Sequence, residues 1–542
     1  MKKRVSSLML AGLAVLFVLS GCGGGGSSNN PATPDTTPPT VLSTSPTNSA
    51  QKAAVVPVTA VFSEGMDSST LTAASFLMTK NGAPVTGTVS ANGATATFTP
   101  TSSRLDYGAL YAGTITTAAK DLAGNALVSA HTWTFTTKTN LDIKAGGLYN
   151  VALQNDGTVW SWGENTTWGM GRDIGLVMSD PIPALVSIPT STVIKMIVTG
   201  EGHTLAVDAD NKIYSWGQNF YGELGNGTAT ASMTPVLVSM PTLSAGVTIS
   251  AVAAGSYHSL ALASDGTVYA WGHNVTGELG DGTKTDRTTP VKVSGLTNVI
   301  AIAAGYDQGS MGFSLALKSD GTVWGWGCNW DYELAHDNAD GACGAECFDD
   351  TATPVQLHGL ANVTSIAAGY AFGAAVNAGG NVLAWGWNNL GVFGNGTCGA
   401  TSTFAPSPAL QSATTGTTPL SGVASVVAGR IGNSQEAYVL ALKADGTVWG
   451  WGNNNFGVLG DGTTGATVYC QGSANIPNLR TYPVQALGLT DIVALSTGEA
   501  HSIALRSDGT VWAWGSDSNS ILGLDESVIA NPVLTPTKVP NF

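Results

Sequence analysis

An eight-residue phrase ending in Trp-Gly recurs seven times and constrains the fold of this chain more than any other feature. It reads DGTVWSWG at 156–163 and DGTVWAWG at 508–515, and two weaker copies, DNKIYSWG and GGNVLAWG, lie at 210–217 and 379–386. Successive copies are 54 to 66 residues apart. Self-similarity at a period of tens of residues indicates a repeat architecture. The repeat tryptophans are Trp162, Trp216, Trp271, Trp326, Trp385, Trp451 and Trp514.

One full unit, at 299–357, contains four short segments with strand character. They are VIAIAAG at 299–305, FSLALKS at 313–319, TVWGWG at 322–327 and TPVQL at 353–357. The Asp-Gly pair between the second and third segments is typical of a tight hairpin turn. Four strands in each of seven units predict an all-β fold, namely a seven-bladed β-propeller.

The order AAG, His-x-LAL, DGTVWAWG, GELGDGT and TPV is similar to the regulator-of-chromosome-condensation repeat family over the whole of 141–542. The resemblance implies the same propeller fold. The chain enters the array at 143–154, which we interpret as two strands only, and leaves it at 534–542, which supplies a fourth strand. We therefore expect one blade to combine 141–154 with 508–542, because pairing the two ends would remove exposed strand edges.

The first 21 residues have the layout of an export signal. Three cations at residues 2–4 precede an apolar run that is too short to span a bilayer comfortably. The run ends in Leu-Ser-Gly-Cys, which resembles a bacterial lipobox and implies lipidation of Cys22 and membrane anchoring through it. Gly23, at the place where an Asp would favour retention in the inner membrane, implies an outer-membrane lipoprotein facing the periplasm or the exterior. The alternative is a plain signal peptide with an incidental cysteine.

Between the signal and the array lie a tether and a small domain. Residues 22–37 are rich in Gly, Ser, Pro and Thr, which predicts a flexible tether. Residues 38–138 alternate apolar and polar positions in short Val/Thr/Phe-rich segments, which indicates an antiparallel β-sandwich. Its phrases FSEGMD and DLAGN resemble bacterial Ig-like domains, which usually act as stalks. Glu64, Asp67 and Asp121 could approach a cation there, but we favour solvated turn residues.

The charge balance excludes some classes of partner. Lys and Arg number 21 against 36 Asp and Glu, a formal net charge of −15. A nucleic-acid partner would require a basic face, so none is expected. The charge gives no support for binding of the folded part to anionic lipid either.

Two recurring positions invite a functional interpretation that the repeat register argues against. Three histidines fall thirteen residues before a repeat Trp, but Phe or Tyr fills the same place elsewhere, so we expect packing residues with a backbone hydrogen bond for His rather than metal ligands. Glu223, Glu278 and Glu333 recur seven residues after the Trp, which indicates a structural motif rather than a glycosidase carboxylate pair. We expect no enzyme, no metal site and no cofactor. The ring position holds Tyr149, His203, His258, Phe313, Phe372, Tyr438 and His501.

The departures from the repeat are concentrated in the fourth, fifth and sixth units. Insertions lengthen the link between the first two strands at 306–312 and 430–437, and the link between the last two strands at 328–350, 395–418 and 462–480. In an antiparallel blade these two links emerge on one face, so we expect a binding face there. Aromatic residues and Arg are the usual anchors of interfaces. The candidates are Trp330, Tyr332, Phe348, Phe393, Phe404, Arg430, Phe456, Tyr469 and Arg480, with packing inside the loops as the alternative for each.

Apart from Cys22, every cysteine lies in those same insertions: Cys328, Cys343, Cys347, Cys398 and Cys470. In an exported protein this predicts disulfides that staple loops. We expect Cys398 to pair with Cys470 and two of the other three to pair together. The acidic run at 337–350 could hold Ca²⁺, although it lacks EF-hand spacing and a solvated loop is favoured.

The leading hypothesis is a monomeric, lipid-anchored display protein whose propeller binds a protein or a glycan at the cell surface. The alternative is an inhibitor or regulator of an enzyme, because some secreted propellers of similar repeat inhibit β-lactamases. Guanine-nucleotide exchange, known in the nuclear branch of the family, and a polysaccharide-active enzyme are less favoured. Fold alone does not decide among these functions.

Overall fold

The computed structural model confirms an all-β chain. It describes residues 34–53, 58–80, 82–101, 105, 109–137, 142–175, 177–191, 193–306, 312–335, 350–399, 402–408, 419–431, 436–470, 475–524 and 531–540. The predictions on Cys22, Cys343, Cys347, Phe348 and a Ca²⁺ site at 337–350 lie outside these residues. Within this part of the chain the helical structure is a single 3-10 turn, Ser518–Ser520, and no helix is long and apolar enough to cross a membrane.

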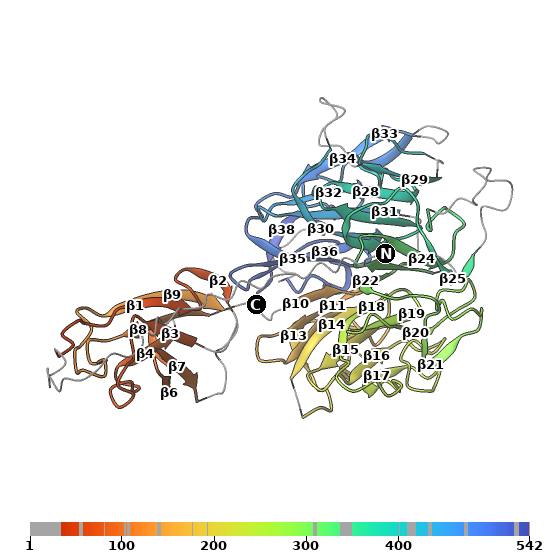
Figure 1. The fold of residues 1–542 in the computed structure, drawn as a ribbon. Helices are drawn as coiled ribbons and strands as arrows, with labels where there is room; N and C mark the ends of the chain where they lie inside the picture. The colour runs from red at the N-terminus through yellow and green to blue at the C-terminus, as the bar shows by residue number, and fades with distance from the viewer. Residues whose placement is uncertain are drawn as a thin grey trace, which may run out of the picture.

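The N-terminal part is a β-sandwich of two sheets (Figure 1). Its core holds Trp133, Phe76 and Phe98, with the Phe76 ring 5.7 Å from that of Trp133 and 5.8 Å from that of Phe98. Buried and half-buried residues alternate along Val58–Phe62, as expected for a strand with one face on a core. One sheet orders β1 (Val41–Ser45), β3 (Val58–Phe62), β7 (Thr95–Pro100) and β6 (Gly87–Asn92), and the other β2 (Ala50–Ala53), β9 (His131–Thr137), β8 (Leu110–Ile115), β4 (Phe76–Lys80) and β5 (Ala83–Pro84).

The described residues after position 141 form seven sheets, here called blades one to seven in chain order, each with antiparallel strands A to D (Figure 1). The A strands are β10 (Asp142–Ala145), β14 (Ile194–Thr199), β18 (Ile249–Ala254), β22 (Val299–Ala304), β26 (Val363–Ala368), β30 (Val423–Ile431) and β35 (Ile492–Thr497). The B strands are β11 (Tyr149–Leu153), β15 (His203–Asp208), β19 (His258–Ala263), β23 (Phe313–Lys318), β27 (Phe372–Asn377), β31 (Glu436–Lys443) and β36 (His501–Arg506).

The C strands carry the repeated phrase, and the D strands complete each blade. The C strands are β12 (Val159–Glu164), β16 (Ile213–Gly217), β20 (Val268–Gly272), β24 (Val323–Gly327), β28 (Val382–Trp387), β32 (Val448–Asn453) and β37 (Val511–Gly515). The D strands are β13 (Ser179–Val186), β17 (Ser232–Leu237), β21 (Arg287–Lys292), β25 (Thr351–Gln356), β29 (Ser402–Pro408), β34 (Asn475–Gln485) and β38 (Val533–Lys538), and β33 (Ala466–Tyr469) adds a fifth strand beside β34.

The ring closes differently from our expectation. The prediction that 141–154 shares a blade with 508–542 is wrong, because β10 to β13 form one complete blade and β35 to β38 form another. The turn at Asp156-Gly157 returns the chain directly from β11 to β12, so residues 143–154 are not left over. The A strands of successive blades contact one another around the centre, and β35 contacts β10. The backbone N–H of Glu499 donates to the carbonyl of Gly147 at 2.9 Å across this junction.

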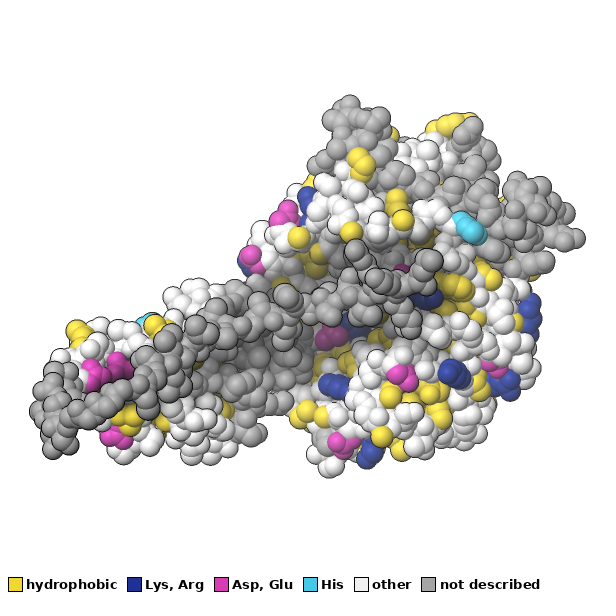
Figure 2. Space-filling model, in the orientation of Figure 1, with side chains coloured by type: hydrophobic (Ala, Val, Ile, Leu, Met, Phe, Trp, Pro, Cys, Tyr) yellow, Lys and Arg dark blue, Asp and Glu magenta, His cyan; other side chains and the backbone are white. Residues whose placement is uncertain are grey.

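Each repeat Trp lies between its own blade and the preceding one. All seven are fully buried. Gly225, in the C–D connection of blade two, lies flat against Trp271 of blade three, where an added Cβ would be 2.7 Å from the indole Nε1. Its φ of 62° also suits glycine. On the visible surface, Lys and Arg are interspersed with Asp and Glu among mostly uncharged side chains (Figure 2), in line with a charged fraction of 11%.

Candidate functional site

The A–B and C–D connections share one face of the propeller, here called the loop face. This follows from the antiparallel order of the strands in all seven blades, which places the B–C and D–A connections on the opposite face. The insertions in blades four to six therefore all belong to the loop face. In blade six the insertion includes β33, which pairs with a lengthened β34 to form an extension of the blade.

The ring-shaped side chains thirteen residues before each Trp are buried packing residues, as expected, but the histidines bond to side chains rather than to backbone. Each reaches the residue that follows the ring position in the next blade. His203 Nε2 lies 2.9 Å from Ser259 Oγ, and His258 Nε2 lies 3.0 Å from Ser314 Oγ. His501 Nε2 lies 2.9 Å from Asn150 Oδ1, and this contact joins blade seven to blade one. These positions thus connect blades and leave no histidine set for a metal among the described residues.

The sequence contains a signal for this pairing. Where the ring side chain is Phe313 or Phe372, the residue in the next blade is Gly373 or Val439, neither of which has a polar side chain. Phe372 and Val439 belong to one hydrophobic cluster. A polar ring is thus matched by a polar partner and an apolar ring by an apolar one.

The three recurrent glutamates hold turns, as the repeat register predicted. Glu223 Oε2 accepts the backbone N–H of Tyr221 at 2.8 Å, and Glu333 Oε2 accepts that of Asp331 at 2.8 Å. Their backbone carbonyls accept the indole N–H of the next blade, as in Trp271 Nε1 to Glu223 O at 2.8 Å. Burial raises the pKa of Glu223 to about 7. These glutamates therefore support turns and contacts between neighbouring blades.

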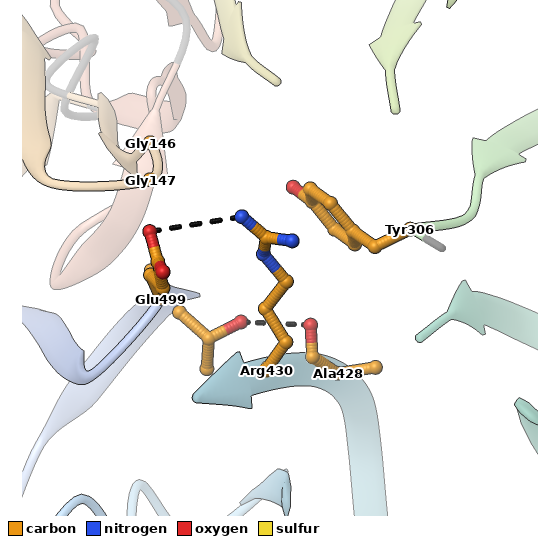
Figure 3. A pocket seen from close by; sticks show the side chains of 9 residues that line it. Gly146, Gly147, Tyr306, Ala428, Arg430 and Glu499 are labelled. Atoms are coloured by element: carbon orange, nitrogen blue, oxygen red, sulfur yellow. Dashed lines mark hydrogen bonds and ion pairs between the residues drawn. The ribbon is translucent and has the colours of Figure 1, made fainter. Parts of the chain in front are cut away.

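The centre of the loop face holds a charged cluster around Arg430, here called the axial cluster: Glu201, Tyr306, Arg430 and Glu499. Arg430 was expected to be an exposed anchor, and this is wrong, because it is only 6% exposed. Its guanidinium lies 2.7 Å from Glu201 Oε1 and 3.6 Å from Glu499 Oε2, over the Tyr306 ring (Figure 3). The A–B connections converge here from blades two, four, six and seven, and this convergence buries the arginine.

The axial cluster caps the central channel. A small cavity of about 10 Å³ lies between Arg430, Glu499 and the Gly146-Gly147 link of blade one. A wider space of about 190 Å³ is lined mainly by alanines of the A strands and by Tyr306. Burial raises the pKa of the Glu499 carboxyl, although Arg430 opposes this rise. Two carboxylates thus share one arginine, and the cluster keeps an excess of negative charge.

Some of the other predicted anchors are exposed, and others are buried or make contacts within the propeller. Trp330, Phe456 and Tyr469 are 55%, 37% and 75% exposed. Phe393 is not an available anchor, because it is buried and packs with Trp451.

Arg480 ion-pairs with Asp461 at 2.7 Å, and Tyr332 is half-buried at a φ of 64°. Phe404 lies in β29, and its side chain is not among those described. Register could have predicted the burial of Phe393, since it occupies the place of Leu224, Leu279 and Leu334 in other units.

The expected disulfide between Cys398 and Cys470 is present and joins the C–D connections of blades five and six. Both residues are buried beside Leu390 and Leu479. Cys328 is buried in blade four. The disulfide therefore fixes two inserted loops to each other at one side of the loop face.

Replacing Cys398 and Cys470 together with serine is expected to lower the free energy of unfolding by about 2–4 kcal/mol, because the cross-link between residues 72 apart restricts the unfolded chain. Denaturant unfolding of the oxidised wild type, the reduced wild type and the variant measures this. The reduced wild type and the variant should coincide, and equal stability of all three would contradict the expectation.

In the N-terminal sandwich, the carboxylates of Asp35, Glu64 and Asp121 lie within 4.8 Å of one another. Asp121 Oδ1 accepts the backbone N–H groups of Ala123 and Asn125 at 2.9 and 2.8 Å. Asp67 is separate and accepts the backbone N–H of Ser69 at 2.9 Å. Asp67 and Asp121 thus hold turns, as favoured, although Asp121 is buried rather than solvated.

Comparisons with known proteins support both folded parts. The family model of the RCC1-like domain matches residues 167–542, and that of the bacterial Ig-like domain matches 35–137. The ultraviolet-B receptor UVR8 of Arabidopsis thaliana is 28% identical over 396 residues, which cover 72% of this chain and 80% of UVR8. The human E3 ubiquitin-protein ligase HERC2 is 32% identical over 261 residues, 47% of this chain but only 5% of HERC2.

Solved structures share the propeller fold. Yeast RCC1 (Prp20) bound to Kap60 has a TM-score of 0.58 at 24% identity, covering 74% of this chain and 84% of Prp20. Prp20 of Saccharomyces cerevisiae in a second structure gives the same TM-score at 23% identity. These matches confirm the predicted resemblance and the all-β propeller class.

Proposed function

Because the chain belongs to the family of RCC1-like domain proteins, we propose that its propeller is a non-enzymatic module that binds a protein through the loop face. Two solved structures of one similar protein, Prp20, support a protein partner. Prp20 has been solved in complex with Kap60, and its binding to Gsp1p and histones has been characterised. In the present chain, the histidines and glutamates that could suggest catalysis are used in contacts between blades and in turns.

The observation that carries the proposal is the construction of the loop face around blades four to six. A disulfide fixes the connections of blades five and six, and β33 with β34 extends blade six outward. Tyr469 at the end of β33 is 75% exposed, and Trp330 in blade four is 55% exposed. Exposed aromatic side chains on restrained loops give contact area at little cost in conformational entropy, which favours binding.

The proposal also includes export and lipid anchoring through Cys22. The signal-like residues 1–21 and the lipobox-like sequence before Cys22 support this part, and the tether and Ig-like domain would hold the propeller away from an outer membrane. Replacing Cys22 with alanine in the full chain should then release the protein from the membrane fraction. Retention of that variant in the membrane would contradict lipid anchoring and leave the binding proposal untouched.

The binding part is tested with two matched triple variants of the full chain. One replaces the loop-face residues Trp330, Phe456 and Tyr469 with serine. The other replaces Leu185 and Leu237, both 52% exposed at the ends of D strands, and Ile300, which is 56% exposed at the start of an A strand, all toward the opposite face.

The partner is first isolated from envelope extract with wild-type protein, and its affinity for each variant is then measured. We expect the loop-face triple to weaken binding by about tenfold or more, with less than a twofold change for the control. An equal loss in both triples would contradict the assignment of the loop face. Release of sugars or of other products from a substrate panel would contradict the non-enzymatic part.

A further inference from the structure

The acidic charge of the propeller is concentrated on one face. Between residues 141 and 542 there are 31 acidic and 13 basic residues. Among the side chains that the structure describes, the A–B and C–D connections and the strand ends that flank them hold 14 acidic and 5 basic residues. Glu164, Glu223, Glu278 and Glu333 are the buried members of the acidic set. The opposite half holds 9 acidic and 8 basic residues. Among the described side chains the opposite face is thus almost balanced, and the acidic excess belongs mainly to the loop face.

The few cations of the loop face are already paired with carboxylates of the same face. Every one of the five makes such an ion pair. The pairs are Arg172 with Asp180 at 2.9 Å, Lys284 with Asp350 at 3.3 Å, Arg287 with Asp281 at 2.7 Å, Arg430 with Glu201 at 2.7 Å and Arg480 with Asp461 at 2.7 Å. An acidic partner would therefore meet uncompensated carboxylates and no available cation on this face.

An apolar arc crosses the same face on blades two, three and four. Phe220, Val275 and Trp330 occupy one repeat position, four residues after the Trp, and are 65%, 52% and 55% exposed. In the loops that carry Phe220 and Val275, the Tyr221 ring lies 4.4 Å from the His273 ring, which is a contact between blades two and three. Large apolar side chains that are exposed at equivalent places of consecutive blades form a surface suited to contact with another protein.

We infer that the loop face docks a basic protein surface, with apolar side chains of the partner on the Phe220–Val275–Trp330 arc and its Lys or Arg side chains against the surrounding carboxylates. This inference rests on the proposed function and specifies the chemistry of the partner. Opposite charge accelerates encounter and excludes acidic competitors, and the apolar arc supplies burial. At the axis, Glu201 and Glu499 share a single arginine, so negative charge continues to the centre of the face.

The charge part is tested with a fluorescent peptide that contains four lysines and two leucines, and with its lysine-acetylated form. The loop-face variant carries Asp173→Asn, Asp286→Asn and Glu499→Gln in the full chain. The control carries Asp156→Asn, Asp320→Asn and Asp445→Asn in the B–C turns of the opposite face. Both variants lose three charges, so general attraction by the acidic chain changes equally in the two.

At low ionic strength we expect the loop-face variant to bind the lysine peptide about fivefold more weakly than wild type. The control should stay within twofold, and the acetylated peptide should bind none of the proteins measurably. Equal weakening in the two variants would show general polyelectrolyte attraction and overturn the inference.

The apolar part is tested by the affinity for the same lysine peptide, with Phe220→Ser and Val275→Ser together against Leu237→Ser and Ile300→Ser on the opposite face. We expect about a fivefold loss of affinity for the arc pair only, and an equal loss in both pairs would overturn the role of the arc.

The outcome is separable from that of the proposed function. If the isolated partner still requires the loop face but the peptide does not discriminate between faces, the basic nature of the partner is wrong and protein binding stands.

Discussion

Replacing Trp216 with alanine is expected to lower the free energy of unfolding of the propeller by about 3–5 kcal/mol. The side chain is fully buried between blades one and two, and its Nε1 donates to the carbonyl of Gly169 at 2.8 Å. Gly171 lies against the same indole, where an added Cβ would be 2.5 Å from Nε1. The substitution therefore leaves a cavity between two blades and removes a partner of a buried carbonyl. Denaturant unfolding followed by near-ultraviolet circular dichroism measures the loss.

Two controls separate the contact between blades from general loss of an aromatic side chain. Trp330→Ala removes a tryptophan that is 55% exposed and should change stability by less than about 0.5 kcal/mol. Trp216→Phe keeps most of the packing but no N–H for Gly169, so an intermediate loss is expected. If Trp216→Ala and Trp330→Ala cost the same, the repeat tryptophans do not hold the blades together.

The sequence predicted the parts of the fold that depend on local pattern. The position of Trp216 and the Asp-Gly turns followed from the repeat register, and the pairing of Cys398 with Cys470 agrees with their place in neighbouring inserted loops. Ring closure was mispredicted because residues 143–154 were treated as half a blade, although the turn at 156–157 pairs them with the next strand.

Arg430 shows the other limit of sequence reasoning. Its partners Glu201 and Glu499 are far from it in sequence, and Tyr306 belongs to yet another blade, blade four. These residues meet only because A–B connections converge on the axis of a closed ring. From the sequence alone, an arginine in a lengthened A–B link is therefore predicted to be an exposed anchor. Its burial depends on the convergence of A–B links at the axis of the ring. The same geometry brings together the acidic residues of the loop face, which the total charge alone could not locate.

Acid is expected to destabilise the propeller through the three histidines that join blades. Burial lowers the pKa of His203 to about 3, of His258 to about 4 and of His501 to about 3, from an ordinary value near 6.5. As the pH falls below 6.5 the unfolded chain binds protons that the folded chain does not. Stability is therefore full above that pH and falls by about 1.4 kcal/mol per pH unit for each histidine down to pH 3–4.

The hydrogen bonds explain why these rings stay neutral. The Ser259 hydroxyl donates to the carbonyl of Glu223, so the ring of His203 donates from Nε2 to the Ser259 oxygen. Its Nδ1 is buried without a hydrogen-bond partner among the described residues. Adding a proton there would create a buried charge and an unsatisfied donor at once, which folding opposes.

The chain itself offers a substitution that should remove one of these protons. Blades four and five meet with Phe313 and Gly373 at the two positions that His203 and Ser259 occupy between blades two and three. We expect the double variant His203→Phe, Ser259→Gly to reduce the slope of unfolding free energy against pH between 6.5 and 4. The reduction should be about 1.4 kcal/mol per pH unit, which corresponds to one proton. Urea unfolding at several pH values measures the slope for the wild type and for the double variant. An unaltered slope in the double variant would mean that His203 is protonated in the folded chain, contrary to its place between the blades.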